Sequence, residues 1–225
     1  MTYATLKSDA EIQRQVLQEL VWDPRVDAAE IGVQVKAGIV TLTGAIESYA
    51  KKIAAREAAH RVAGVLDVAD ELKVHVGTGK ERLDTDLAQA VRSALEWDAF
   101  VPDEKIRSTV SNGWVTLEGE VEQWTQREDA RRAVERLTGV RGVTNQILVR
   151  PRVVDSGRIR RVVEEALARQ AEREAKRIEV GVEGGVVRLS GTVRSWSEKN
   201  AIERAAGFAP GVRGIENELV VDSTS

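Results

Sequence analysis

The chain has 225 residues, of which 42% are hydrophobic and 31% are charged, a composition typical of a globular protein and not of a disordered one. The formal net charge of −3 excludes the strongly basic surface of a non-specific nucleic-acid-binding protein, and the absence of cysteine excludes a disulfide scaffold. No apolar run approaches the length of a bilayer span, so we expect a protein that is not transmembrane.

One unit of sequence occurs three times along the chain. Glycines mark it at constant offsets of 75 and 72 residues, namely Gly38, Gly113 and Gly185, then Gly44, Gly119 and Gly191, then Gly64, Gly139 and Gly211. A period this long allows each copy to bury a small core of its own. The sequence therefore predicts three domains in a row, residues 1–77, 78–151 and 152–225, with formal net charges of −2, −2 and +1.

Each copy begins with an amphipathic helix. In the first copy this helix covers residues 8–21, and Ser8 and Glu11 have the spacing of a capping box. Apolar residues recur at intervals of four in all three copies: Ile12, Val16 and Leu20; Leu87, Val91 and Leu95; Ile159, Val163 and Leu167. This period predicts that one face of the helix packs into the core of the domain.

A hairpin of two strands follows this helix. In the first copy, alternating apolar and polar residues predict strands over residues 31–35 and 40–42, with a turn at residues 37–38 between them. At the same place the second copy has Asn112-Gly113, which suits a type I′ turn. We expect the second strand of each copy to end at a glycine, namely Gly44, Gly119 and Gly191.

A second helix and a third strand complete each copy. In the first copy the helix covers residues 49–62 and is rich in alanine, and the strand covers residues 68–74. Gly64, Gly139 and Gly211 fit the left-handed position just after this helix. Each copy is thus predicted as an α-β-β-α-β domain of the α+β class, with a three-stranded mixed sheet and both helices on one face. Residues 77–80 and 150–154 form short linkers.

The repeated motif resembles the BON domain, a family named after bacterial osmotic-stress and nodulation proteins. In the second copy the resemblance rests on Val115, Thr116, Leu117, Gly119, Gly139, Val140, Val143, Asn145, Ile147 and Val149. The first copy departs from it at Asp70, in the place of Asn145, and the third at Arg188, in the place of Thr116. The resemblance implies a non-enzymatic module with a mixed α/β fold that binds phospholipid surfaces or other hydrophobic ligands and occurs in osmotically induced proteins.

An aromatic residue begins the second helix of each copy, and a cation follows it three residues later. The pairs are Tyr49 and Lys52, Trp124 and Arg127, and Trp196 and Lys199. An amphipathic ring beside a cation can contact a lipid headgroup or another anionic ligand. The other interpretation is structural, with the ring packed over the start of the helix and the cation in solvent.

Three further tryptophans are candidates for an interaction surface. Trp22 and Trp97 end the first helices of the first two copies, whereas the third copy has Arg169 there, so the core does not require the ring. They lie either at the edge of the core or on a contact surface. Trp114 is on the polar phase of its strand, where the other copies also have an apolar residue. This indicates that a neighbouring domain or a partner covers that face.

No catalytic or metal-binding constellation stands out. His60 and His75 are the only histidines, both lie in the first copy, and there is no cysteine, so we expect no metal site and no cofactor. The motif GVRG at residues 139–142 and 211–214 is similar to the GxxG loop of KH domains, which bind nucleic acids. Here it joins a helix to a strand, which favours a structural turn. We therefore expect neither enzymatic activity nor a nucleic-acid partner.

Two functional hypotheses follow. In the first, a stress-associated protein attaches its three domains to phospholipid surfaces, or to a small hydrophobic or anionic ligand, through the aromatic and basic pairs. In the second, a scaffold or holdase-type protein binds protein partners through exposed apolar faces that include Trp22, Trp97 and Trp114. The first residues lack the charged and apolar segments of a signal peptide. We therefore expect a cytoplasmic location, or a periplasmic one if a leader has been removed.

Overall fold

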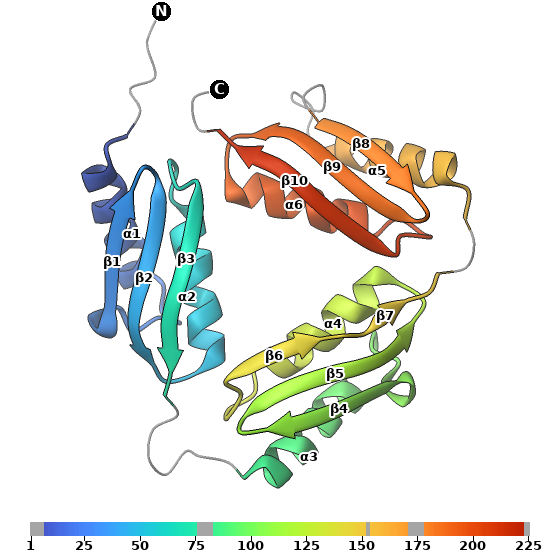
Figure 1. Ribbon diagram of the computed structural model, residues 1–225, viewed down its shortest axis with the longest axis horizontal. Coiled ribbons are helices and arrows are strands. Elements are labelled where there is room, and N and C mark those ends of the chain that lie inside the picture. The colour runs from blue at the N-terminus through green and yellow to red at the C-terminus, as the bar shows by residue number, and fades with distance from the viewer. Residues whose placement is uncertain (1–6, 76–82, 152–153, 171–177, 223–225) are drawn as a thin grey trace, which may run out of the picture. The chain divides into compact units, whose positions relative to one another are not determined.

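The computed structural model describes residues 7–75, 83–151, 154–170 and 178–222. The linker predicted at residues 77–80 lies outside these ranges. Three domains follow one another along the chain (Figure 1).

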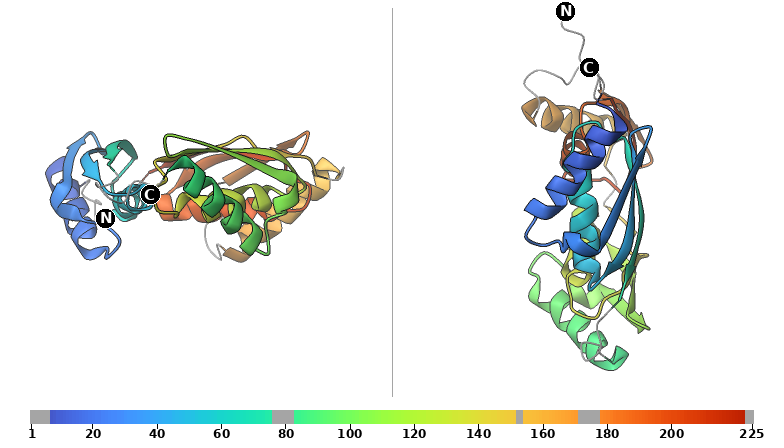
Figure 2. Two further views of the ribbon diagram at one scale, coloured as in Figure 1. Left: turned by 90° about the horizontal axis from the view of Figure 1, so that it is seen from below. Right: turned by 90° about the vertical axis from the view of Figure 1, so that its left-hand side faces the viewer.

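The first domain has the predicted order of elements. They are α1 (Asp9–Trp22), the short 3₁₀ helix η1 (Ala28–Glu30), β1 (Ile31–Lys36), β2 (Ile39–Ile46), α2 (Tyr49–Arg61) and β3 (Asp67–Val74). The central strand β2 pairs antiparallel with β1 and parallel with β3, so the sheet is mixed. Both helices lie on the same face of this sheet (Figure 2).

The other two domains repeat this order. The second contains α3 (Asp84–Trp97), η2 (Asp103–Lys105), β4 (Ile106–Ser111), β5 (Trp114–Val121), α4 (Trp124–Glu135), β6 (Gly142–Asn145) and β7 (Leu148–Val149). The third contains α5 (Ser156–Gln170), β8 (Ile178–Glu183), β9 (Val186–Val193), α6 (Trp196–Gly207) and β10 (Gly214–Val221). In the second domain the third strand is interrupted, and β6 and β7 both pair parallel with β5. The predicted α+β fold with three mixed sheets is confirmed.

The start of α1 confirms the capping box. Ser8 accepts a hydrogen bond from the backbone N–H of Glu11 at 3.3 Å, and the Glu11 carboxylate accepts the backbone N–H of Ser8 at 2.8 Å. These bonds satisfy two of the donors that every helix leaves unpaired at its first turn. They fix the residue at which the helix begins.

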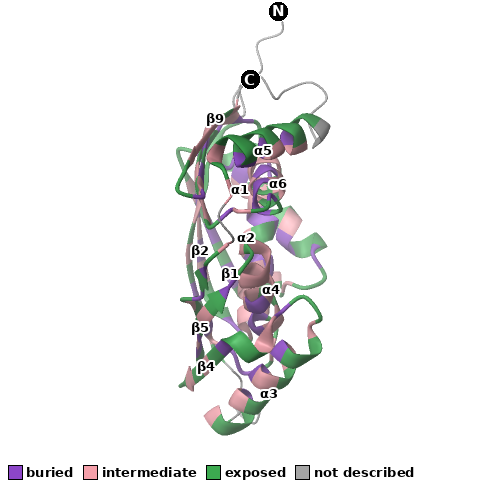
Figure 3. Ribbon diagram, turned by 90° about the vertical axis from the view of Figure 1, so that its right-hand side faces the viewer, coloured by how far each residue is buried: buried purple, intermediate pink, exposed green. Residues whose placement is uncertain are grey.

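The core of each domain lies between the two helices and the sheet (Figure 3). The residues predicted at intervals of four on the first helices are all buried: Ile12, Val16, Leu20, Leu87, Val91, Leu95, Ile159, Val163 and Leu167. The central strands contribute Val40 and Leu42, Val115 and Leu117, and Val187 and Leu189, each 0% exposed. The alanines of α2 that face this core let the helix approach the sheet closely.

The hairpin turns confirm the predicted type I′ conformation and receive additional support from the first helix. Asn112 and Gly113 have φ angles of 50° and 78°, and both backbone N–H groups donate to the carboxylate of Asp84, at 2.7 and 3.0 Å. In the first domain Ala37 adopts the same left-handed conformation, with φ 51°. There the carboxylate of Asp9 accepts the two turn N–H groups at 2.8 and 2.9 Å.

The second strands do not end at their glycines, contrary to the sequence prediction. β2 continues through Gly44 to Ile46, because its parallel pairing with β3 extends to Val74 after the pairing with β1 has stopped. Gly44 has φ 125°, and a Cβ atom there would lie 2.1 Å from the carbonyl oxygen of Glu30. The glycine is therefore needed because the backbone of the preceding segment approaches closely. Gly119 meets the carbonyl of Lys105 in the same way.

The glycines after the second helices have the expected left-handed conformation, but in a separate turn. α2 ends at Arg61, and Gly64, with φ 99°, follows in a turn closed by a bond from Val65 N–H to Val62 C=O at 3.3 Å. Equivalent bonds join Val140 to Leu137 and Val212 to Ala209. The glycine therefore serves the turn that leads into the third strand rather than the helix end itself.

Candidate functional site

The three predicted aromatic residues occupy equivalent places. Tyr49, Trp124 and Trp196 are the first residues of α2, α4 and α6, and each is partly exposed. The cation that follows in each pair lies one helical turn further along. The fold thus presents the same pair of residue types once in every domain.

In the first domain the cation is engaged by its own domain. The ammonium group of Lys52 donates to the backbone carbonyl of Leu72 in β3 at 2.6 Å and lies 3.4 Å from the Asp70 carboxylate. The side chain of Lys52 is 23% exposed. Lys52 therefore connects α2 to the edge strand, and Asp70 neutralises much of its charge locally.

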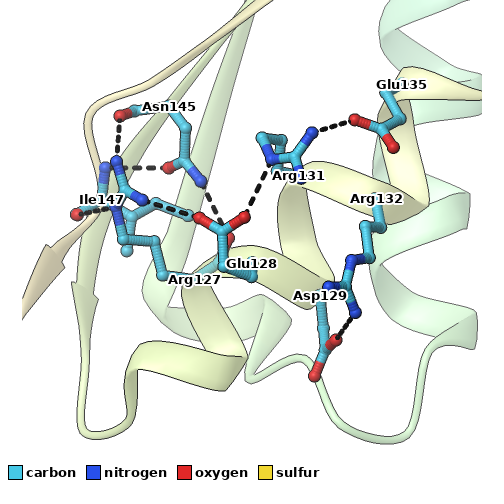
Figure 4. Close-up of polar contacts among 8 residues, drawn as sticks. All are labelled: Arg127, Glu128, Asp129, Arg131, Arg132, Glu135, Asn145 and Ile147. Atoms are coloured by element: carbon cyan, nitrogen blue, oxygen red, sulfur yellow. Dashed lines mark hydrogen bonds and ion pairs between the residues drawn. The ribbon is translucent and has the colours of Figure 1, made fainter. Parts of the chain in front are cut away.

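Arg127 has the same role in the second domain, with more contacts (Figure 4). Its guanidinium donates to the carbonyls of Ile147 and Asn145, at 3.1 and 3.0 Å, where the third strand is interrupted. A third bond, of 2.8 Å, joins it to the carboxylate of Glu128. Glu128 also binds Arg131 at 3.0 Å, so Arg127 is part of a network of charges along α4.

The third pair is arranged differently. The ammonium group of Lys199 lies 4.8 Å from the centroid of the Trp196 ring, within the range of a cation–π interaction. Lys199 therefore contacts the ring of its own pair, a contact that was not predicted from the sequence. Within the first two pairs, the cation instead contacts the third strand.

A shared hydrogen bond explains why the first domain can have Asp70 in the place of Asn145. In each domain the side-chain oxygen accepts the backbone N–H two residues further on, at 3.2 Å for Asp70, 3.2 Å for Asn145 and 3.3 Å for Asn217. Both residue types supply this acceptor. In the first two domains the residue whose N–H is bound in this way, Leu72 or Ile147, also has its carbonyl bound by the cation. These side chains saturate backbone groups at the edge of the sheet, which limits pairing with another strand there.

Trp22 and Trp97 are the most exposed of the predicted rings. They are 76% and 87% exposed, at the ends of α1 and α3. The sequence left open whether these rings lie at the edge of the core or on a contact surface. The structure places both rings on the surface. Side chains of this size gain little stability from the core when they are so exposed.

Trp114 lies on the open face of its sheet and is 55% exposed. A Cβ atom at Gly142, its partner across β5 and β6, would lie 2.3 Å from the indole ring. The ring therefore covers the backbone of the neighbouring strand, and glycine is the residue that leaves room for it. This accounts for Gly142, the second glycine of the GVRG motif in this domain, whereas a Cβ atom at Gly214 of the third domain would meet nothing within 4 Å.

A charged cluster in the first domain was not predicted from the sequence. Asp23 is 6% exposed and accepts bonds from Arg25 and Arg61, both as short as 2.8 Å. These bonds hold the pKa of the Asp23 carboxyl far below its usual range, despite the opposing effect of burial. Each arginine also binds a second carboxylate, Glu57 or Glu19. The only sequence signal for this cluster was the presence of acidic and basic residues near two helix ends. Because most such residues are exposed, this signal does not indicate a buried ion pair.

A shallow depression of about 700 Å³ lies on the second domain beside Gly119. Three cations and three carboxylates line it, namely Lys105, Arg107, Arg150, Glu118, Glu120 and Glu122. Two of the cations form ion pairs within it, Arg150 with Glu120 at 2.7 Å and Lys105 with Glu122 at 3.4 Å. The charges of the depression thus balance, and it has no electrostatic preference for an anion.

Metal ligands do not gather anywhere among the described residues, in that no group of three or more His, Cys, Asp or Glu side chains could hold an ion. Within the same residues, no helix combines the length and apolarity that crossing a bilayer requires.

Comparison with known proteins identifies the repeated unit. The family model of the BON domain matches three times, at residues 8–75, 83–151 and 155–223. The chain therefore belongs to the BON domain family, as its motif indicated. It is also 30% identical to the osmotically-inducible protein Y of Escherichia coli (strain K12) over 145 residues, which cover 62% of this chain and 71% of that protein.

Two solved structures of CdsD, a structural protein of the type III secretion system of Chlamydia trachomatis, also align with the chain. One covers 93% of this chain and 91% of the other at 12% identity, with a TM-score of 0.26. The second, of the C-terminal domain, covers 96% and 100% at 11% identity, with a TM-score of 0.27. Scores this low establish no common arrangement of the whole chains.

Proposed function

We propose that this chain is a non-enzymatic, stress-associated binding protein that attaches to phospholipid surfaces through the rings that begin the second helix of each domain. The observation that carries the proposal is the recurrence of Tyr49, Trp124 and Trp196 at one equivalent, partly exposed place in all three domains. Amphipathic aromatic side chains suit the boundary between headgroups and acyl chains. Membership of the family and the similarity to an osmotically inducible protein support the same class of function.

The cations of the first two pairs position the rings in this proposal. Lys52 and Arg127 bind carbonyls of the third strand and each has a carboxylate beside it. They fix the first turn of the helix, and with it the ring one turn earlier. Because their charges are largely compensated, binding should depend mainly on the rings and only weakly on salt.

Each ring is a weak contact, so three linked domains are central to the proposal. One interfacial ring contributes about 1–2 kcal/mol, which alone corresponds to a dissociation constant above the millimolar range. Domains joined in one chain bind the same surface at a high effective concentration and multiply these small contributions. A single domain should therefore bind far less tightly than the whole chain.

Co-sedimentation with vesicles tests the proposal. We expect the triple variant Tyr49→Ala, Trp124→Ala, Trp196→Ala to lose vesicle binding while its circular dichroism spectrum stays that of the wild type. The matched control Trp22→Ala, Trp97→Ala removes two more exposed rings and should bind as the wild type does. Vesicles of phosphatidylcholine alone and vesicles with anionic lipid should give similar results. Unchanged binding of a folded triple variant would overturn the proposal.

A protein-binding scaffold is the second candidate, and the exposure of Trp22, Trp97 and Trp114 favours it. These rings are 76%, 87% and 55% exposed, and exposed aromatic surface commonly marks a site of protein contact. In this case the Trp22 and Trp97 variant would lose binding of a protein partner, and the vesicle results would not change. The cytoplasmic location stays a prediction, which cell fractionation tests.

A further inference from the structure

The first and second domains share a turn that follows the first helix. In each, an aspartate accepts the backbone N–H two residues further on, at 3.1 Å from Arg25 to Asp23 and at 3.0 Å from Phe100 to Asp98. Its own carbonyl accepts the N–H of the third residue after it, at 3.0 Å in both domains. Two matching hydrogen bonds set the carboxylate in the same local conformation. Asp23 and Asp98 can therefore be compared directly.

In the first domain this carboxylate is occupied by arginines of the same domain. Arg25 binds it in a bidentate manner, with Nε 3.0 Å from one oxygen and a terminal nitrogen 2.8 Å from the other. Arg61 adds a bond of 2.8 Å. Fork-on-fork pairing of this kind is the preferred geometry between guanidinium and carboxylate. Asp23 thus shows what the turn binds when a guanidinium is available.

In the second domain neither arginine reaches the corresponding place. Phe100 stands in the position of Arg25, and Arg136, in the position of Arg61, is exposed. Asp98 forms no ion pair with any residue that the structure describes. Burial raises the pKa of Asp129, and repulsion from the nearby negative charge of Asp98 adds to this rise. Another cation would therefore bind favourably beside Asp98.

Two exposed rings flank this carboxylate. Trp97, at 87% exposed, precedes it, and Phe100, at 77%, follows the turn. Aromatic faces attract cations, and a planar guanidinium can stack on a ring while its edge pairs with a carboxylate. The Asp98 patch, which consists of Trp97, Asp98 and Phe100, therefore fits an arginine side chain better than it fits the headgroups of an anionic membrane.

The third domain presents arginines that suit this patch. Arg158, Arg160 and Arg161 lie in the first turns of α5, and all three are exposed. Their side chains form no ion pair or hydrogen bond with the residues that the structure describes. The third domain carries a formal net charge of +1 against −2 for the second, so the overall charges of the two domains favour their association.

We propose that the Asp98 patch of one chain binds the arginines at the start of α5 in a second copy of the chain. The contact joins two different surfaces, so in a pair one chain keeps its set of arginines unused and the other chain keeps its patch unused. Such a head-to-tail contact extends into open chains unless the geometry closes a ring. With few anchoring residues, we expect association at about 0.1–1 mM protein. The inference is independent of the membrane attachment proposed above.

Sedimentation equilibrium of the full chain tests this contact. The wild type should show a weight-average mass that rises with protein concentration and falls when salt is added. Asp98→Asn keeps an oxygen that can accept the turn N–H of Phe100 but removes the charge, and it should weaken association several-fold. Glu118→Gln, which removes one charge on the open sheet face, is the matched control and should associate as the wild type does.

A charge exchange gives the decisive comparison. Asp98→Arg and the triple variant Arg158→Asp, Arg160→Asp, Arg161→Asp should each stay monomeric alone, because like charges then face each other. Mixed together they should associate again, since each supplies the charge that the other needs. A wild type that stays monomeric throughout this range, or an Asp98→Asn variant that associates as the wild type does, would overturn the proposal. Salt-sensitive binding to a basic peptide without self-association would also overturn it, and would assign the patch to another protein.

Discussion

The core of the second domain can be tested by truncating Leu117 to alanine. Leu117 is 0% exposed and lies in the central strand β5, where it pairs with Ser108 on one side and Asn145 on the other. Removing most of a side chain from such a site loses its burial and leaves a cavity, at a cost of about 2–5 kcal/mol. A domain of roughly this size has a total stability of only about 5–10 kcal/mol. The variant should therefore lose a large part of the stability of its domain.

Hydrogen exchange of the full chain measures this loss domain by domain. Amides of β4 and β5 should exchange faster by a factor of about 30 or more, the equivalent of at least 2 kcal/mol, while β1 and β2 of the first domain stay protected. The control Leu148→Ala changes a residue that is 56% exposed in the same domain and should alter exchange little. Unchanged protection in β5, or an equal loss in both domains, would refute the assignment of separate cores.

Three further predictions follow from single contacts. Ala37→Gly should stabilise the first domain by up to about 1 kcal/mol in thermal unfolding, because φ at this residue is 51°. Asn145→Leu should destabilise the second domain by about 1–3 kcal/mol in urea, because it leaves the N–H of Ile147 without its acceptor, whereas Asn145→Asp should cost much less. Asp23→Asn should lower the melting temperature at pH 7. The pKa of Asp23 is depressed in the folded state, so the stability that its carboxylate provides is present above pH 4 and is lost as the pH falls further. The difference in melting temperature between Asp23→Asn and the wild type should therefore narrow from pH 4 to pH 2.

Regular features of the fold were predictable because they depend on residues that are near each other in sequence. Helix faces follow from apolar residues at intervals of four, and the capping box from Ser8 and Glu11. The left-handed turn follows from Asn112-Gly113. The end of β2 was not predictable in this way. Its last residues are held by parallel pairing with β3, which the sequence of β2 alone does not contain.

The candidate site shows the same division between local and long-range information. Spacing along the helix placed each cation one turn after its ring, but it could not show that carbonyls of the third strand lie within reach of Lys52 and Arg127. Likewise, the sequence left open whether Trp22 and Trp97 lie at the edge of the core or on a contact surface, and the structure shows them 76% and 87% exposed. Position in the repeat indicated which residues are equivalent in the three domains, and only the tertiary contacts indicated what each one binds.

The central claim is that three rings in one chain attach it to phospholipid surfaces, and a stepwise series of variants tests it most directly. Vesicle affinity is measured for the wild type and for chains with Trp124→Ala, then with Trp196→Ala added, then with Tyr49→Ala added, on zwitterionic vesicles. The account predicts that each replacement weakens binding by about 5- to 30-fold, as expected for about 1–2 kcal/mol per ring, while the fold is retained. Affinity that stays constant along a series of folded variants would contradict it.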